Sequence, residues 1–219
     1  MNVSTLVFDL DGTISDPSSG IVNCVNYALD KCGYELQAAE KISAEIGPPL
    51  DLMFGKFIPG ITDTQMNELV IAYRERFVVD GFSENTLYEG MADKIDALHK
   101  SGFRLGVCTS KPEKSARKVL QHFDLLSYFE FVSGGDIGIA KQSQLTDLLN
   151  DSVIDKDAVM IGDRGVDLSA GRNNELRTVG VLWGFGSREE LVAEKPALIL
   201  QNVDELLTSF TSNRRIVNS

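Results

Sequence analysis

Two aspartates, Asp9 and Asp11, stand two residues apart where an apolar run meets a glycine. The run Leu6-Val7-Phe8 predicts a buried strand, and in an extended backbone a spacing of two places both side chains on the same side. Crowded carboxylates raise each other's energy unless a cation joins them or a proton neutralises one of them. The segment therefore predicts chemistry that uses a bound cation or a shared proton.

Further polar residues come at the ends of other predicted strands. Asp163 directly follows the apolar run 159–162, and Asp167 comes four residues later. In a doubly wound parallel sheet, ligands bind beyond the carboxyl ends of the strands, so side chains at these ends converge on one edge. The groups that we expect at this edge, besides Asp9 and Asp11, are Thr109, Ser110, Lys141, Asp163 and Asp167.

The elements that must position these groups alternate between strand and helix patterns, which predicts an α/β fold. Several strand candidates are continuous apolar runs with β-branched residues, as is typical of strands covered on both faces. We therefore expect a parallel sheet with helices on both sides and right-handed connections. The predicted strands are residues 5–8, 103–109, 130–133, 159–162, 178–182 and 197–199.

One interval, residues 18–80, contains no convincing strand. Its apolar residues recur at helical spacing, and Gly33 is suited to end the first helix. Thr62 and Gln65 match a capping box before a second helical stripe. Between the two stripes, Gly47-Pro48-Pro49 excludes regular helix and predicts a stiff loop.

The simplest account of this interval is an inserted α-helical cap subdomain. We assign residues 17–86 to the cap and residues 1–16 and 87–219 to the core. The hinge strands are expected at residues 15–17 and 88–90, where the cap leaves and rejoins the core. A cap over the ends of the strands would exclude water and set substrate specificity.

The composition excludes some partners. A net charge of −11 and an isoelectric point near 4.7, with no Lys- or Arg-rich run, argue against binding to a nucleic-acid polymer. The longest apolar runs have the length of strands, so no membrane span is expected. An acidic protein still binds a small phosphate ester where its site supplies a lysine, a metal ion and backbone N–H groups.

The cysteines indicate the compartment. Cys24, Cys32 and Cys108 form no CxxC pair, which favours reduced structural thiols over a disulfide framework. No basic segment followed by an apolar stretch marks a secretory signal, so a cytoplasmic location is expected. A monomer and a homodimer fit the composition equally well.

The motifs resemble the haloacid dehalogenase-like (HAD) hydrolase superfamily. Within it, the chain resembles the phosphoglycolate phosphatase-like branch, which carries a helical (C1) cap between the first two motifs. The likeness covers nearly the whole chain and is most specific in Asp9-Leu10-Asp11-Gly12-Thr13 and in residues 162–167. It implies a Rossmann-like doubly wound core and Mg²⁺-dependent hydrolysis of a phosphomonoester through an aspartyl phosphate.

The resemblance also implies a role for each matching residue. Asp9 would attack phosphorus, and Asp11 would act first as general acid and then as general base. Thr109 and N–H groups near it, including that of Ser110, would bind phosphoryl oxygens. Lys141 would balance negative charge, with Lys111 as the competing lysine.

The same resemblance implies the metal ligands and the loop that faces the substrate. Asp9, the backbone carbonyl of Asp11 and Asp163 would bind Mg²⁺, while Asp167 would act through water, by orienting neighbours or by direct ligation. The loop that contains Gly47 and Pro48 resembles the substrate-facing loop of the cap in this branch.

Several substrates and activities are compatible with these motifs. Phosphoglycolate and nucleoside 5′-monophosphates are both reasonable substrates of a phosphatase of this kind. A sugar-phosphate mutase would use the same intermediate and return the phosphoryl group to its substrate. The spaced acidic pair and the predicted cap argue against a signalling receiver module. A haloacid dehalogenase needs neither Asp11 nor a metal ion, so the presence of Asp11 and of metal-binding residues argues against that activity.

Overall fold

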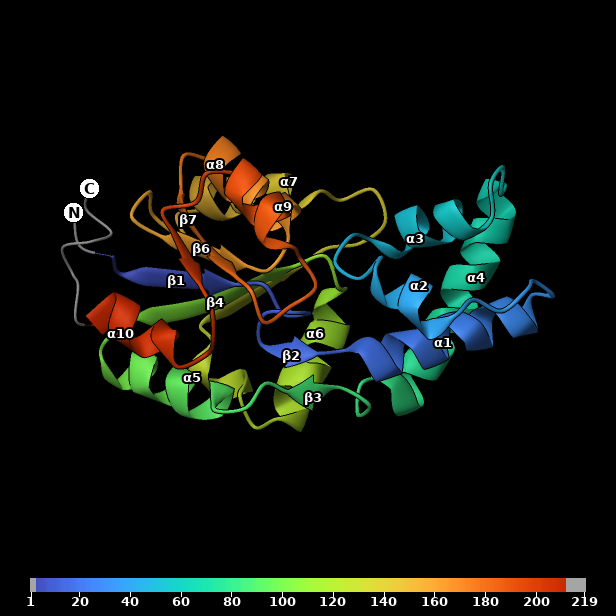
Figure 1. The fold of residues 1–219 in the computed structure, drawn as a ribbon, viewed down its shortest axis with the longest axis horizontal. Helices are drawn as coiled ribbons and strands as arrows, with labels where there is room; N and C mark the ends of the chain where they lie inside the picture. The colour runs from blue at the N-terminus through green and yellow to red at the C-terminus, as the bar shows by residue number, and fades with distance from the viewer. Residues whose placement is uncertain (1–2, 212–219) are drawn as a thin grey trace.

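Six parallel strands form the sheet that positions the candidate site (Figure 1). The computed structural model describes residues 3–211. The strands are ordered β5-β4-β1-β6-β7-β8, so the first strand of the chain lies between the two halves of the sheet. Their bounds are β1 (Thr5–Phe8), β4 (Arg104–Thr109), β5 (Phe131–Gly134), β6 (Val159–Gly162), β7 (Arg177–Val181) and β8 (Leu198–Leu200).

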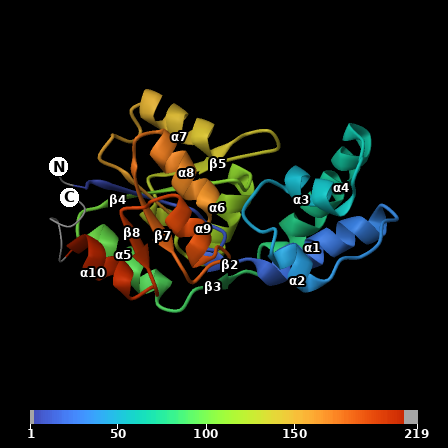
Figure 2. The same ribbon diagram turned by 45° about the horizontal axis from the view of Figure 1, so that its top comes forward.

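The strands are buried on both faces because successive side chains point to opposite sides. In β1, Leu6 and Phe8 join the larger apolar cluster, whereas Val7 joins a second cluster on the other side. Three helices cover the first face, namely α5 (Met91–Lys100), α6 (Glu113–His122) and α10 (Glu205–Thr211). The opposite face is covered by α7 (Lys141–Asn150), α8 (Gly165–Asn173) and α9 (Arg188–Ala193), as Figures 1 and 2 show.

This arrangement confirms the predicted α/β fold with a doubly wound parallel sheet. All six predicted strands are present, and two of them, 5–8 and 159–162, have the predicted bounds. The other four begin or end one residue away from the prediction, because an apolar run does not mark where pairing with the neighbouring strand stops.

A separate group of helices lies beyond the carboxyl ends of the strands (Figure 1). It consists of α1 (Ser18–Lys31), α2 (Ala39–Ser43), α3 (Leu50–Phe57), α4 (Asp63–Arg76) and a π-helical turn, η1 (Phe77–Gly81). An antiparallel pair, β2 (Ser15–Asp16) and β3 (Thr86–Leu87), joins this group to the sheet. The second hinge strand was predicted at residues 88–90, but the strand that pairs with β2 is Thr86–Leu87, just before them. The domain bounds 17–86, 1–16 and 87–219 stay a prediction.

We call this group of helices, α1 to η1, the cap. Local signals explain where its helices begin and end. Helix α1 ends before Gly33, whose φ of +77° suits glycine in the left-handed region. Thr62 and Gln65 form the predicted capping box: the Thr62 N–H donates to Gln65 Oε1 at 3.0 Å, and the Gln65 N–H donates to Thr62 Oγ1 at 3.4 Å. The predicted Gly47-Pro48-Pro49 loop connects α2 to α3. Within residues 3–211, no helix is both long enough and apolar enough to cross a bilayer.

Candidate active site

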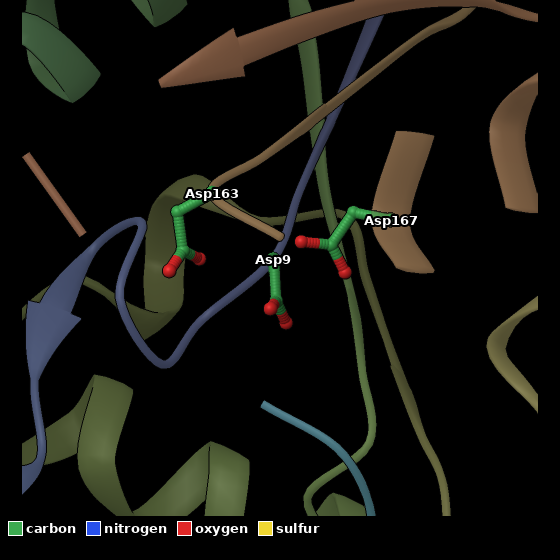
Figure 3. Close-up of side chains that lie close together, drawn as sticks. All are labelled: Asp9, Asp163 and Asp167. Atoms are coloured by element: carbon green, nitrogen blue, oxygen red, sulfur yellow. The ribbon is translucent and has the colours of Figure 1, made fainter. Parts of the chain in front are cut away.

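Three buried aspartates meet at the carboxyl edge of the sheet (Figure 3). Asp9 directly follows β1, Asp163 directly follows β6, and Asp167 lies in the first turn of α8. One carboxylate oxygen of each lies within 4.8 Å of the others, and the residues are 2%, 0% and 0% exposed. Since β1 and β6 are paired in parallel, both strands deliver their aspartates to the same place. We call Asp9, Asp163 and Asp167 the acid cluster.

Asp163 is held by groups from two distant loops. The Thr13 hydroxyl donates to Asp163 Oδ1 at 3.0 Å, and the Phe185 N–H donates to Oδ2 at 2.8 Å. Gly12 makes this approach possible: its φ is +85°, and a Cβ built there would lie 2.2 Å from Asp163 Oδ2. The glycine of the first motif is therefore required both by its backbone conformation and by the space that Asp163 occupies.

Lys141, the first residue of α7, lies between two members of the acid cluster. Its Nζ is 2.9 Å from Asp9 Oδ1 and also pairs with Asp167, and its side chain is 3% exposed. Burial alone would lower the pKa of Lys141, but the Asp167 and Asp9 carboxylates outweigh burial and hold that pKa above its ordinary value. Lys141 is therefore a fixed positive charge beside Asp9.

The acid cluster carries more negative charge than Lys141 balances. Burial raises the pKa of Asp163 well above its ordinary value, and the charges of Asp167 and Asp9 raise it further. Burial also raises the pKa of Asp167 to about 6, although Lys141 opposes this shift. With all three acids ionised, two negative charges remain uncompensated. Because Mg²⁺ prefers carboxylate and water oxygens and needs few protein ligands, these residues fit a magnesium ion.

The Asp11 side chain contacts Lys111 rather than Lys141. Lys111 Nζ lies 2.7 Å from Asp11 Oδ2, and the two side chains are 6% and 13% exposed. The other oxygen, Oδ1, is out of contact with solvent and has no hydrogen-bond partner. Lys111 also lies over the Phe77 ring of the cap, 4.6 Å from its centroid. The structure thus places Lys141 beside Asp9 and Lys111 beside Asp11, so the two lysines do not occupy the same position.

Thr109 ends β4 next to this pair and is 1% exposed. Its hydroxyl accepts a hydrogen bond from the Lys111 N–H at 3.3 Å, so it also shapes the turn that leads to α6. Its carbonyl accepts from the Gln144 side chain at 3.1 Å. Ser110, the next residue, lines the space between the cap and the sheet.

A pocket opens between the cap and the carboxyl edge of the sheet. Its core side includes Asp11, Ser110 and Lys111, and its cap side includes Gly47 and Pro48. The rest of its wall is mainly apolar, from Ile21, Ile46, Pro49, Leu50, Met53, Tyr73, Phe77, Pro112 and Ile137, and it also includes Ser115 and the paired side chains of Arg74 and Asp136. The residues predicted to face the substrate therefore share one pocket with the predicted general acid.

Some residues of the site are not apparent from the sequence. The Phe185 N–H and the Thr13 hydroxyl both donate hydrogen bonds to Asp163. In the sequence, only the glycine-rich loop after β7, Trp183-Gly184-Phe185-Gly186, indicates that Phe185 could belong to the site. Ser187 and Glu190 have the spacing of a capping box, but only half of that box forms. Ser187 Oγ accepts from the Glu190 N–H at 3.1 Å, but Glu190 Oε1 accepts from the Gly165 N–H at 2.6 Å, at the start of α8.

The arrangement is suited to a particular kind of reaction. A buried cluster with excess negative charge can hold a divalent cation. The cation and Lys141 can then attract an anionic group of the substrate and bring it into contact with the Asp9 carboxylate. The adjacent pocket begins at Asp11 and Lys111, on the side where the remainder of a small molecule would extend from the acid cluster toward the cap. Fold and site together fit an α/β enzyme that acts on phosphate esters.

Comparisons with known proteins agree with this class. A model of the haloacid dehalogenase-like hydrolase family matches residues 6–181, and the chain belongs to this family. The chain is 35% identical over 195 residues to a 5′-nucleotidase of Pseudomonas aeruginosa, covering 87% of this chain and 88% of the relative. It is 25% identical over 217 residues to a phosphoglycolate phosphatase of Vibrio parahaemolyticus, covering 94% and 95% of the two chains.

The fold is also shared with solved structures. A crystal structure described as a predicted phosphatase from Clostridium acetobutylicum superposes with a TM-score of 0.90 at 31% identity, covering 97% of this chain and all of the other. With the family match, these similarities identify the chain as an HAD-like phosphatase.

Proposed function

We propose that the chain is a Mg²⁺-dependent phosphomonoesterase that forms a phosphoryl intermediate on Asp9. The observation that carries the proposal is the position of Asp9, buried beside Asp163 and Asp167 and 2.9 Å from the ammonium of Lys141. A carboxylate needs no base to act as a nucleophile at neutral pH. Lys141 is suited to attract the phosphoryl oxygens to this carboxylate.

The first step is transfer of the phosphoryl group. A carboxylate oxygen of Asp9 attacks phosphorus, the bond between phosphorus and the ester oxygen breaks, and Asp11 gives its proton to the departing alkoxide. The pocket wall near Asp11 supports this role because it leads the leaving group toward the cap. Thr109 and the N–H groups after β4 are suited to hold the phosphoryl oxygens during transfer.

The second step releases phosphate. Asp11, now ionised, accepts a proton from a water molecule as that water attacks phosphorus, and the bond between phosphorus and Asp9 breaks. Lys111 Nζ, 2.7 Å from Asp11 Oδ2, keeps the Asp11 side chain in a defined place throughout. One proton therefore leaves Asp11 in the first step and returns to it in the second.

The magnesium ion would be held by Asp9, Asp163 and the backbone carbonyl of Asp11, with Asp167 bound directly or through water. When bound, it supplies positive charge that lowers the repulsion between these acids and a phosphate dianion. Asp167 has a second task on the chain itself, since it accepts from the Arg164 N–H at 3.0 Å and pairs with Lys141.

The proposed substrate is a small phosphorylated metabolite such as phosphoglycolate. Nucleoside 5′-monophosphates are the second candidate, because the surface of the pocket beside Asp11 is more apolar than polar, as contact with a nucleoside requires. The 35% identical relative named 5′-nucleotidase supports the same candidate. A cytoplasmic location and a monomeric or dimeric state remain predictions from the sequence.

A metabolite panel tests the proposal. Purified protein is incubated with Mg²⁺ and phosphoglycolate, UMP, AMP or a sugar phosphate, and both free phosphate and isomerised product are measured. We expect steady release of free phosphate from at least one ester. Isomerised sugar phosphate without free phosphate would instead establish a mutase, and a single turnover without release would contradict the proposed hydrolysis.

A further inference from the structure

We propose that Arg164 is a positioning residue that couples the substrate-facing loop of the cap, residues 46–50, to the loop that carries Asp163 and leads to Asp167. The inference rests on the proposed function in one respect: one of the two measurements that test it is the rate of the phosphatase reaction. Among the residues that line or adjoin the site, Arg164 contacts the cap with its side chain and the acid cluster with its main chain.

The contacts of Arg164 link three parts of the molecule. Its Nη1 donates to the carbonyl of Ile46 in the cap, and its Nε donates to Glu190 Oε1 at 3.0 Å. Its backbone N–H donates to Asp167 Oδ2 at 3.0 Å, and the residue directly follows Asp163. A movement of the cap loop therefore acts on the same residue whose backbone holds the acid cluster.

The cap loop is shaped to receive this arginine. Gly47 has a φ of +124°, which residues other than glycine rarely adopt, and a Cβ built there would lie 3.0 Å from Arg164 Cγ. The glycine thus brings the loop backbone close to the arginine stem, while the neighbouring carbonyl of Ile46 accepts its hydrogen bond. Since Gly47 and Pro48 also line the pocket, the position of Arg164 bears on the space that the substrate occupies.

Glu190 fixes the arginine from the core side. Its Oε1 accepts from Arg164 Nε and also from the Gly165 N–H, at 2.6 Å, where α8 begins. The Arg164 and Glu190 side chains are 18% and 33% exposed, so the pair is partly shielded from water. Because the guanidinium is planar with several fixed donors, one arginine can hold Glu190 and Ile46 together, whereas a lysine offers a single point charge.

Another contact between cap and core provides a matched control. Lys118, on α6, donates through Nζ to the carbonyl of Val78 in the π-helical turn of the cap. This is also a bond from a cationic side chain to a backbone carbonyl, but Lys118 is not part of the described pocket wall or of the acid cluster. If Arg164 merely helped to hold the cap against the core, loss of either contact would have similar effects.

The experiment compares Arg164→Gln, Arg164→Lys and Lys118→Met with the wild-type protein, each as the full chain with Mg²⁺. Hydrogen–deuterium exchange is followed in residues 44–54, and kcat and KM are measured with the ester that the wild type hydrolyses best. For Arg164→Gln we expect at least tenfold faster exchange and at least tenfold lower kcat/KM, mainly through KM. Arg164→Lys should lie between this variant and the wild type, and Lys118→Met should stay within twofold of the wild type in both measurements.

Two results would overturn the inference. One is exchange in Arg164→Gln within twofold of the wild type, or equal acceleration in Lys118→Met. The other is faster exchange without a change in KM in an active enzyme. Circular dichroism checks that each variant folds, and if Arg164→Gln does not, the difference between Arg164→Lys and Lys118→Met decides. If the wild type releases no phosphate from any ester, the proposed function fails, while the exchange measurement still tests the coupling.

Discussion

Replacing Lys141 with methionine tests the electrostatics of the site directly. The change keeps most of the side-chain volume and removes the only ammonium that contacts the acid cluster among the described residues. The side chains of Lys141, Asp9 and Asp167 are 3%, 3% and 0% exposed, so water cannot replace the lost charge. Removing one partner of a buried ion pair lowers the free energy of unfolding by about 3–5 kcal/mol.

That loss is large against the whole stability of a domain, which is on the order of 5–15 kcal/mol. We therefore expect Lys141→Met to unfold at a much lower urea concentration than the wild type when EDTA is present. Added Mg²⁺ should recover much of the difference, because a divalent cation at Asp9 and Asp163 replaces the missing positive charge and stabilises the state that binds it. Turnover should stay low even with Mg²⁺, because the charge beside Asp9 is absent.

Equilibrium unfolding in urea, with EDTA and with Mg²⁺, is the assay. The matched control is Lys156→Met, which removes an exposed ion pair with Glu175 and should leave the unfolding free energy nearly unchanged. An unfolding free energy for Lys141→Met equal to that of Lys156→Met would refute the reasoning. A deficit that Mg²⁺ does not reduce would show that the acid cluster does not bind the cation.

The other predictions concern the two aspartates of the proposed reaction, the metal and the thiols. Asp9→Asn should keep the wild-type circular dichroism spectrum and lose turnover, so measurable phosphate release by this variant would exclude the assigned nucleophile. Asp11→Asn should accumulate phosphorylated protein in acid-quenched samples and release phosphate slowly; hydrolysis at the wild-type rate would contradict its role as base. EDTA should silence the enzyme and Mg²⁺ should restore it, whereas full activity in metal-free buffer would disprove the metal requirement. Burial raises the pKa of Cys108 to about 12 and also raises that of Cys24, so neither buried thiol should react at pH 8 until the chain unfolds. Burial raises the pKa of Cys32 too, but this thiol is only half-buried, so it should react slowly in the folded protein. Loss of all three thiols before unfolding would be inconsistent with this burial.

The parts of the fold that depend on local sequence could be predicted. The strands 5–8 and 159–162 are continuous apolar runs, and their ends carry Asp9 and Asp163, so the expected meeting of these aspartates follows from parallel pairing alone. Thr62 and Gln65 identified a helix start because both halves of a capping box lie within four residues. The short helices α2 and α3 were not predicted individually, because segments of this length are stabilised by packing rather than by their own propensity.

The parts of the site that depend on distant contacts could not be predicted. The family resemblance chose Lys141 over Lys111 as the lysine beside Asp9, and the structure has Lys141 there. The residues alone leave that choice open, because both lysines follow strands and which of them meets Asp9 depends on the order of strands and on the path of the loop before α7. The hydrogen bond from the Phe185 N–H to Asp163 uses a backbone group, which every residue except proline carries. The contact between Arg164 and Ile46 joins residues that are 118 positions apart, and neither residue type indicates it.

The central claim is that Asp9 carries the phosphoryl group during hydrolysis, and chemical trapping tests it most directly. Wild-type protein is quenched during turnover of phosphoglycolate or UMP with Mg²⁺ and treated with sodium borohydride, which reduces an acyl phosphate to the alcohol and so marks the phosphorylated aspartate as homoserine. Mass spectrometry then locates the mark. The account predicts homoserine at position 9 only when substrate and Mg²⁺ are both present. Steady release of phosphate with the mark at another aspartate, or with no mark at any time of quenching, would contradict it.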